Sequence, residues 1–139
     1  MAFLYLDSSV VLRYVYRQPG FLELAKRRET VVASPLTGVE CLRSLDRIRL
    51  EQPPQPSWQT RRALLSLVLD HVQEIDLTRA ILTRAGGPLA VPLKALDAIH
   101  LASALFWHEL HGGLGFATHD RALARAARLY GLQVVGITD

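Results

Sequence analysis

The chain has 139 residues, of which half are hydrophobic and 21% are charged, and its net charge is +3 at pH 7. This balance excludes a disordered chain, and the length predicts a single domain over residues 1–139. Charged residues interrupt every apolar run before the roughly 20 residues that a membrane span needs, so we expect no membrane segment. The start, MAFLYLDSS, has no basic segment and Cys41 is the only cysteine. We therefore expect a cytoplasmic protein without an internal disulfide.

The first part of the chain alternates strand and helix signals. Residues 2–6 are an apolar run rich in strand formers. A helix over residues 8–16 follows, with one of the two serines at its start as the expected cap. A proline–glycine pair ends this helix, and we expect a short helix over 21–28 and a buried strand over 30–33.

The middle of the chain is dominated by two helical segments. Pro35 suits the first turn of a long helix that reaches residue 50. QPPQPS, residues 52–57, is incompatible with regular structure and predicts a loop. A helix over 58–70 and a weak strand over 72–75 follow.

The last part repeats the alternation. Thr78 is the expected cap of a helix that stops at a Gly-Gly-Pro sequence, and the segment KALDAIHLASAL begins a helix over 94–110. A strand over 115–117, a helix over 120–130 and a strand over 133–137 complete the chain. Because strands alternate with helices throughout, we expect an α/β fold whose central, mostly parallel sheet is covered on both faces.

Four acidic residues fall where such a sheet would bring them together. Asp7 follows the first strand and Asp120 the fourth, and ligands bind at the carboxyl ends of parallel strands. Glu40 and Asp97 lie near the starts of their helices. These helix starts lie at the same edge of the sheet as the carboxyl ends of the strands, and we call this edge the rim. Converging carboxylates repel one another, so the cluster favours a cation, and oxygen ligands suit Mg²⁺ or Mn²⁺. Because such ions activate water, we expect hydrolysis of a nucleic-acid backbone.

Each acid also has a simpler interpretation. Asp7, Asp97 and Asp120 could cap the helices that they precede or begin, and Glu40 could be a solvated helix residue. The metal hypothesis therefore depends on the joint placement of the four acids.

Four segments resemble successive motifs of one nuclease family: FLYLDSSVVLRYV, SPLTGVECL, LDAIHLASAL and FATHDRALARAARLYGLQVV. They are similar to the motifs of PIN-domain ribonucleases, and most of all to the VapC-type toxins, in the same order along the chain. The resemblance implies a three-layer α/β/α fold. It also implies that Asp7, Glu40, Asp97 and Asp120 hold magnesium or manganese.

The same resemblance implies a metal-dependent endoribonuclease that is the toxin of a type II toxin–antitoxin system. RNA would be its substrate, a cognate antitoxin its partner and a homodimer its assembly. Ser9 matches a small polar position beside the first acid, and Thr118 matches a hydroxyl before the last. Arg13 could bind a phosphate of the substrate strand. The alternative is an inactive PIN-like binding module, although the presence of all four acids counts against it.

Three other polar features have weaker signals. The sequence HELH at 108–111 is one residue shorter than H-E-x-x-H, so its imidazoles would not share a helix face, and we expect no zinc site. Cys41 lacks the partners of a nucleophile and is expected to be a buried, inert thiol. His100, one turn after Asp97, is interpreted as a packing or supporting group.

Overall fold

The computed structural model describes residues 1–51 and 57–137. Within them, strands form a sheet in the order β3-β2-β1-β4-β5, and each neighbouring pair is parallel. The strands are β1 (Phe3–Leu6), β2 (Thr30–Ala33), β3 (Gln73–Glu74), β4 (Leu114–Ala117) and β5 (Gln133–Val135). The predicted parallel sheet is confirmed, whereas most of the predicted loop over 52–57 lies outside the described residues.

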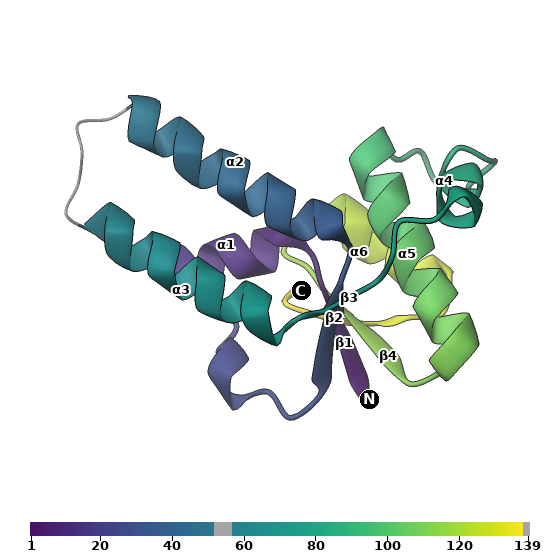
Figure 1. The fold of residues 1–139 in the computed structure, drawn as a ribbon. Helices are drawn as coiled ribbons and strands as arrows, with labels where there is room; N and C mark the ends of the chain where they lie inside the picture. The colour runs from purple at the N-terminus through teal and green to yellow at the C-terminus, as the bar shows by residue number, and fades with distance from the viewer. Residues whose placement is uncertain (52–56, 138–139) are drawn as a thin grey trace.

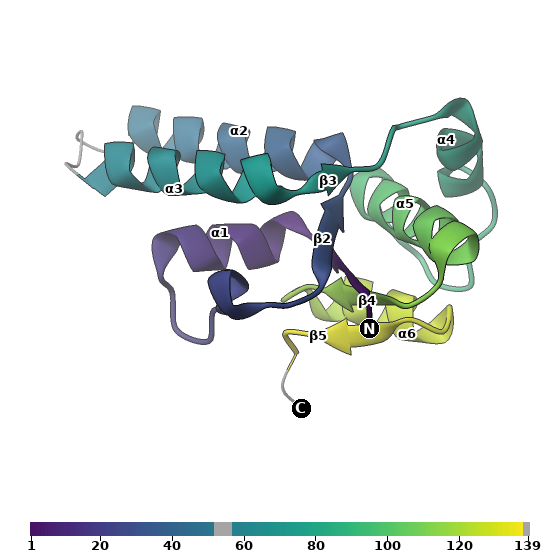
Figure 2. The same ribbon diagram turned by 60° about the horizontal axis from the view of Figure 1, so that its bottom comes forward.

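Helices cover both faces of this sheet (Figures 1 and 2). They are α1 (Ser8–Tyr16), α2 (Pro35–Glu51), α3 (Ser57–His71), α4 (Arg79–Ala85), α5 (Ala95–His111) and α6 (Arg121–Leu129). The first three lie on one side of the sheet and the last three on the other, which gives the expected α/β/α layers. Among the described helices, none is both long and apolar enough to cross a membrane.

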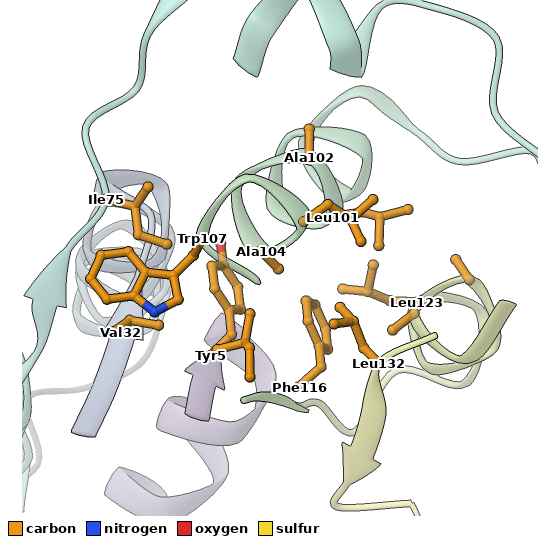
Figure 3. Close-up of a cluster of buried hydrophobic side chains, with 14 of the residues drawn as sticks. Tyr5, Val32, Ile75, Leu101, Ala102, Ala104, Trp107, Phe116, Leu123 and Leu132 are labelled. Carbon is orange, nitrogen blue, oxygen red and sulfur yellow. The ribbon is translucent and has the colours of Figure 1, made fainter. Parts of the chain in front are cut away.

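Strand β1 divides the core into two apolar clusters. Its alternating side chains send Leu4 and Leu6 to the face covered by α1, α2 and α3. Tyr5 points to the opposite face, where it stacks on Phe116 with ring centroids 5.0 Å apart beneath α5 (Figure 3). Because both faces of β1 are buried, this strand fixes the sheet between the two helical layers.

The predicted helix over 21–28 is wrong. The chain forms only a single 3₁₀ turn there, η1 (Leu24–Lys26). The N-cap residue of this turn, Glu23, makes no side-chain capping hydrogen bond, whereas Thr78 caps the short helix α4. The apolar side chains of the segment, such as Phe21, pack individually against the core. Arg27 and Glu29 then form a two-bond ion pair at 3.1 and 2.7 Å that fixes the approach to β2.

The last strand is shorter than predicted because Gly136 ends it. This glycine has a φ of 105°, and a Cβ at this position would stand 2.6 Å from the carbonyl oxygen of Thr118. The carbonyl of Gly136 also accepts a hydrogen bond from Nδ1 of His119 at 2.8 Å. The glycine therefore lets the C-terminal segment close against the loop that follows β4.

We expect Gly136→Ala to lower the free energy of unfolding by more than Gly131→Ala does. Gly131 also has a positive φ, of 89°, but no neighbouring atom lies within 4 Å of its Cβ position. Backbone strain should therefore cost about 1 kcal/mol in both variants, and the close contact about 1–3 kcal/mol more at position 136. Urea unfolding of the two variants measures the difference, and equal losses would refute the close-contact argument.

Candidate active site

Asp7 lies between β1 and α1 and is 4% exposed. It stands at the N-cap position of α1, yet its side chain makes no capping hydrogen bond. Instead, its Oδ2 accepts hydrogen bonds from the hydroxyls of Ser9, at 2.6 Å, and Thr118, at 2.9 Å. The capping interpretation of Asp7 is therefore wrong. The expected serine cap is wrong as well, because Ser9 donates its proton to a carboxylate, the stronger acceptor.

Backbone amides hold the two hydroxyls in turn. The N–H of His119 donates to Ser9 Oγ and the N–H of Asp120 donates to Thr118 Oγ1, both at 3.0 Å. The hydroxyl oxygens are 3.4 Å apart. The loop after β4 thus fixes the orientation of the Asp7 carboxylate, because its backbone amides hold the two hydroxyls that bind the carboxylate. Ser9 and Thr118 both lie at the site.

Glu40 comes from α2, in the opposite helical layer from α5, yet it contacts His100 of α5. The Nε2 of His100 lies 2.5 Å from Glu40 Oε1 and 3.9 Å from Asp7 Oδ1. The Glu40 side chain is only 26% exposed, so its interpretation as a solvated helix residue is wrong. His100 itself is completely buried and joins the two acids.

The interpretation of His100 as a packing or supporting group agrees with its burial and contacts. Sequence reasoning missed Tyr5, whose hydroxyl lies 2.6 Å from His100 Nδ1. One signal was present, since an imidazole on the apolar face of a buried helix needs hydrogen-bond partners. Its partners are far away in the sequence, however, and spacing alone could not identify them.

Asp97 lies in the first turn of α5 and does not cap it, because Lys94 occupies the N-cap position. Its pKa is raised, first by partial burial and then by the negative charges of Asp120 and Asp7, with a smaller contribution from Glu40. All three of the other acids therefore act on Asp97 electrostatically. The four carboxylates that the sequence singled out share one region of the rim.

Asp120 does cap a helix, as its simpler interpretation held. Its Oδ1 accepts a hydrogen bond from the N–H of Leu123 at 3.1 Å, at the start of α6. Within the described residues, Oδ2 makes no hydrogen bond. Capping and a contribution to the charge of the rim are thus compatible in this residue.

Arg13 and Cys41 are the two remaining candidates from the sequence. Nη1 of Arg13 lies beside Gly20, and its positive charge contributes, after burial, to a lowered pKa of His119. Its predicted contact with phosphate stays a prediction. Burial raises the pKa of the Cys41 thiol to about 12, with further contributions from Glu40 and Asp7. The predicted inert thiol agrees with this environment.

The donor chemistry of the rim fits a hard divalent cation. Carboxylate oxygens predominate, and after partial burial the charges of Asp120 and Asp7 raise the pKa of Asp97, a cost that a cation would offset. As they stand in residues 1–51 and 57–137, however, no three His, Cys, Asp or Glu side chains form a group that could hold an ion. The type and charge of the donors, and not a closed coordination cage, support metal binding.

Comparison with known proteins gives consistent matches. The family model of the PIN domain matches residues 4–129. Ribonuclease VapC46 of Mycobacterium tuberculosis is 32% identical over an alignment of 139 positions. The alignment covers 97% of this chain and 98% of the relative.

Two solved structures have a similar fold. One is VapBC2 from Rickettsia felis bound to a DNA fragment from their promoter, with a TM-score of 0.66, 13% identity and coverage of 96% of this chain and 97% of that chain. The other is PAE2754 from Pyrobaculum aerophilum, with a TM-score of 0.61 and 23% identity. The match covers 97% of this chain and 84% of that chain.

Asp97→Asn should stabilise the metal-free protein at neutral pH. The folded-state pKa of Asp97 lies above its unfolded value, so stability is lost as the pH rises through that window, and the loss is complete at neutral pH. The gain in melting temperature should shrink as the pH falls towards the ordinary aspartate pKa of about 3.9. Thermal melts in chelator at several pH values measure it.

Asp70→Asn is the matched control, because Asp70 is exposed at the end of α3. It removes the same charge far from the rim and should give little of this pH-dependent gain. Added Mn²⁺ should raise the melting temperature of the wild type more than that of Asp97→Asn, since the cation binds only the folded site. Identical melts and identical gains from Mn²⁺ would show that Asp97 is not a ligand.

Proposed function

The chain belongs to the PIN-domain family, and we propose that it is a VapC-type toxin that cleaves RNA with a divalent cation, Mg²⁺ or Mn²⁺. The observation that carries the proposal is the gathering of carboxylates from four separate segments on one rim: Asp7, Glu40, Asp97 and Asp120. The 32% identity to a ribonuclease along nearly the whole chain supports it.

The residues of the rim have separate roles in this proposal. When bound, the cation activates water and stabilises charge on the phosphodiester. Asp7 is held rigidly by its two hydroxyl donors, so it is a preorganised ligand. Asp97 and Asp120 supply further negative charge beside it. Arg13 offers a positive charge that acts on His119 and to which a strand phosphate can bind.

The proposed partners are a cognate antitoxin and a second copy of the chain. The structural neighbour from Rickettsia felis is a VapBC2 assembly, which supports a toxin–antitoxin pair here. An arginine from the antitoxin would suit the carboxylates of the rim. Exposed leucines on the helices, such as Leu67 of α3 at 58% exposure, favour a homodimer.

Asp97→Asn should abolish RNA cleavage without unfolding the protein. Loss of supporting groups around a metal typically costs about 10–100-fold, so loss of a direct ligand should cost at least about 100-fold. Total bacterial RNA is incubated with protein and Mg²⁺ or with chelator, and new 5′ ends are sequenced to identify the substrate. Asp70→Asn is the control and should cleave like the wild type.

The outcomes separate the proposal from its alternative. Wild-type protein that cleaves no RNA with either Mg²⁺ or Mn²⁺ would indicate an inactive PIN-like binding module. Cleavage that persists in chelator would refute the metal dependence. Cleavage by Asp97→Asn at the wild-type rate would refute the role of this acid.

The protein should be a homodimer at micromolar concentration. Light scattering coupled to gel filtration should give twice the 15.5 kDa mass of one chain. Leu67→Glu tests whether α3 contributes, because a buried charge in an apolar interface would shift the protein towards the monomer. A strictly monomeric wild-type protein would contradict the dimer.

A further inference from the structure

A chain of hydrogen bonds runs through the core to the rim. The N–H of Ser34 donates to the hydroxyl oxygen of Tyr5 at 3.3 Å, and that oxygen lies 2.6 Å from Nδ1 of His100. On the other side of the ring, Nε2 of His100 lies 2.5 Å from Glu40 Oε1. Ser34, Tyr5 and His100 are at most 1% exposed, so water does not compete for these bonds.

The positions of the protons in this series of hydrogen bonds determine which group is the donor in each bond. Burial raises the pKa of Tyr5 far above its usual range, so the phenol keeps its proton. The phenol oxygen already accepts the Ser34 N–H, and the nearby Thr37 hydroxyl gives its own proton to a backbone carbonyl of β1 at 3.0 Å. The Tyr5 proton is therefore directed at Nδ1 of His100. An imidazole that accepts at Nδ1 carries its proton on Nε2 and donates it to Glu40.

This last bond joins the two helical layers at the rim. Glu40 belongs to α2 on one side of the sheet, and His100 belongs to α5 on the other (Figure 2). The same Nε2 lies 3.9 Å from Asp7 Oδ1, so the imidazole stands between two carboxylates that repel each other. Without this donor, a partly exposed glutamate would gain by turning towards water and away from Asp7.

We propose that His100 is a positioning residue of the cation site. Its Nε2–H holds Oε1 of Glu40 beside Asp7 and leaves the second carboxylate oxygen of Glu40 available to a cation. Tyr5 supports it by fixing the tautomer. This inference rests on the proposed function, because it concerns the same cation.

Two substitutions of His100 by an amide distinguish the contact made by Nε2 from the contact made by Nδ1. In His100→Gln, the side-chain amide reaches as far as Nε2 and keeps a donor for Glu40. In His100→Asn, the shorter amide reaches only the place of Nδ1, so it keeps the Tyr5 contact and loses Glu40. Both variants are polar and smaller than histidine, so their losses of packing are similar in kind.

The measurement is Mn²⁺ affinity, followed by electron paramagnetic resonance of the free ion. His100→Asn should bind Mn²⁺ about 10–100-fold more weakly than the wild type, and His100→Gln within about threefold of it. Thermal melts of the same proteins report any purely structural role, which would lower both melting temperatures and leave the affinities equal. Equal Mn²⁺ affinities of the two variants overturn the proposal.

Nitrogen-15 chemical shifts of His100 in the metal-free wild type test the proposal without a variant. A ring that carries a proton on Nε2 is expected, and a ring protonated on Nδ1 alone overturns the proposal whatever the variants do. Absence of Mn²⁺ binding by the wild type would overturn both the proposed function and this inference. Wild-type binding with no difference between the Gln and Asn variants would overturn this inference alone.

Discussion

Repulsion between like charges is the constraint on which the candidate site depends. Asp7, Glu40 and Asp120 act electrostatically on Asp97, whose pKa is raised first by partial burial and then by these negative charges. In the described residues, no lysine or arginine forms an ion pair with any of the four. Hydroxyls, the imidazole of His100 and a backbone amide hold Asp7, Glu40 and Asp120 instead. These hydrogen-bond donors set the geometry and leave the carboxylates available to a cation.

The parallel sheet makes this arrangement possible with little local strain. The carboxyl ends of β1 and its two neighbours meet at one rim, so Asp7, Ser34 and Thr118 are adjacent although they are far apart in the chain. The helices that follow add acids from both layers, with Glu40 from α2 and Asp97 from α5. Because β1 is buried on both faces, the rim is attached to the most rigid part of the core.

Features that depend on local sequence could be predicted, whereas features that depend on tertiary contacts could not. Short apolar runs rich in strand formers identified the strands, and the strand ends identified Asp7 and Asp120. The contact between His100 and Glu40 crosses the sheet, so it depends on how α2 and α5 pack and not on spacing. Gly136 is similar, since its need for glycine arises from the approach of the Thr118 carbonyl. The predicted helix over 21–28 lacks the side-chain cap that Thr78 gives to the similarly short α4, and only a 3₁₀ turn forms there.

In this site, the negative charge of the rim and the orientation of its carboxylates depend on different residues. Removal of an acid changes the charge of the rim, whereas removal of the Ser9 or Thr118 hydroxyl changes where the Asp7 carboxylate points. Asp120 combines both properties, because Oδ1 caps α6 while its charge acts on Asp97. Replacement of Asp120 would therefore remove the cap of α6 and also change the electrostatic potential at Asp97. Asp97 is not the N-cap of α5, which is Lys94. The pKa of Asp97 is raised first by burial and then by the charges of Asp120 and Asp7, and a divalent cation bound beside it would offset both costs.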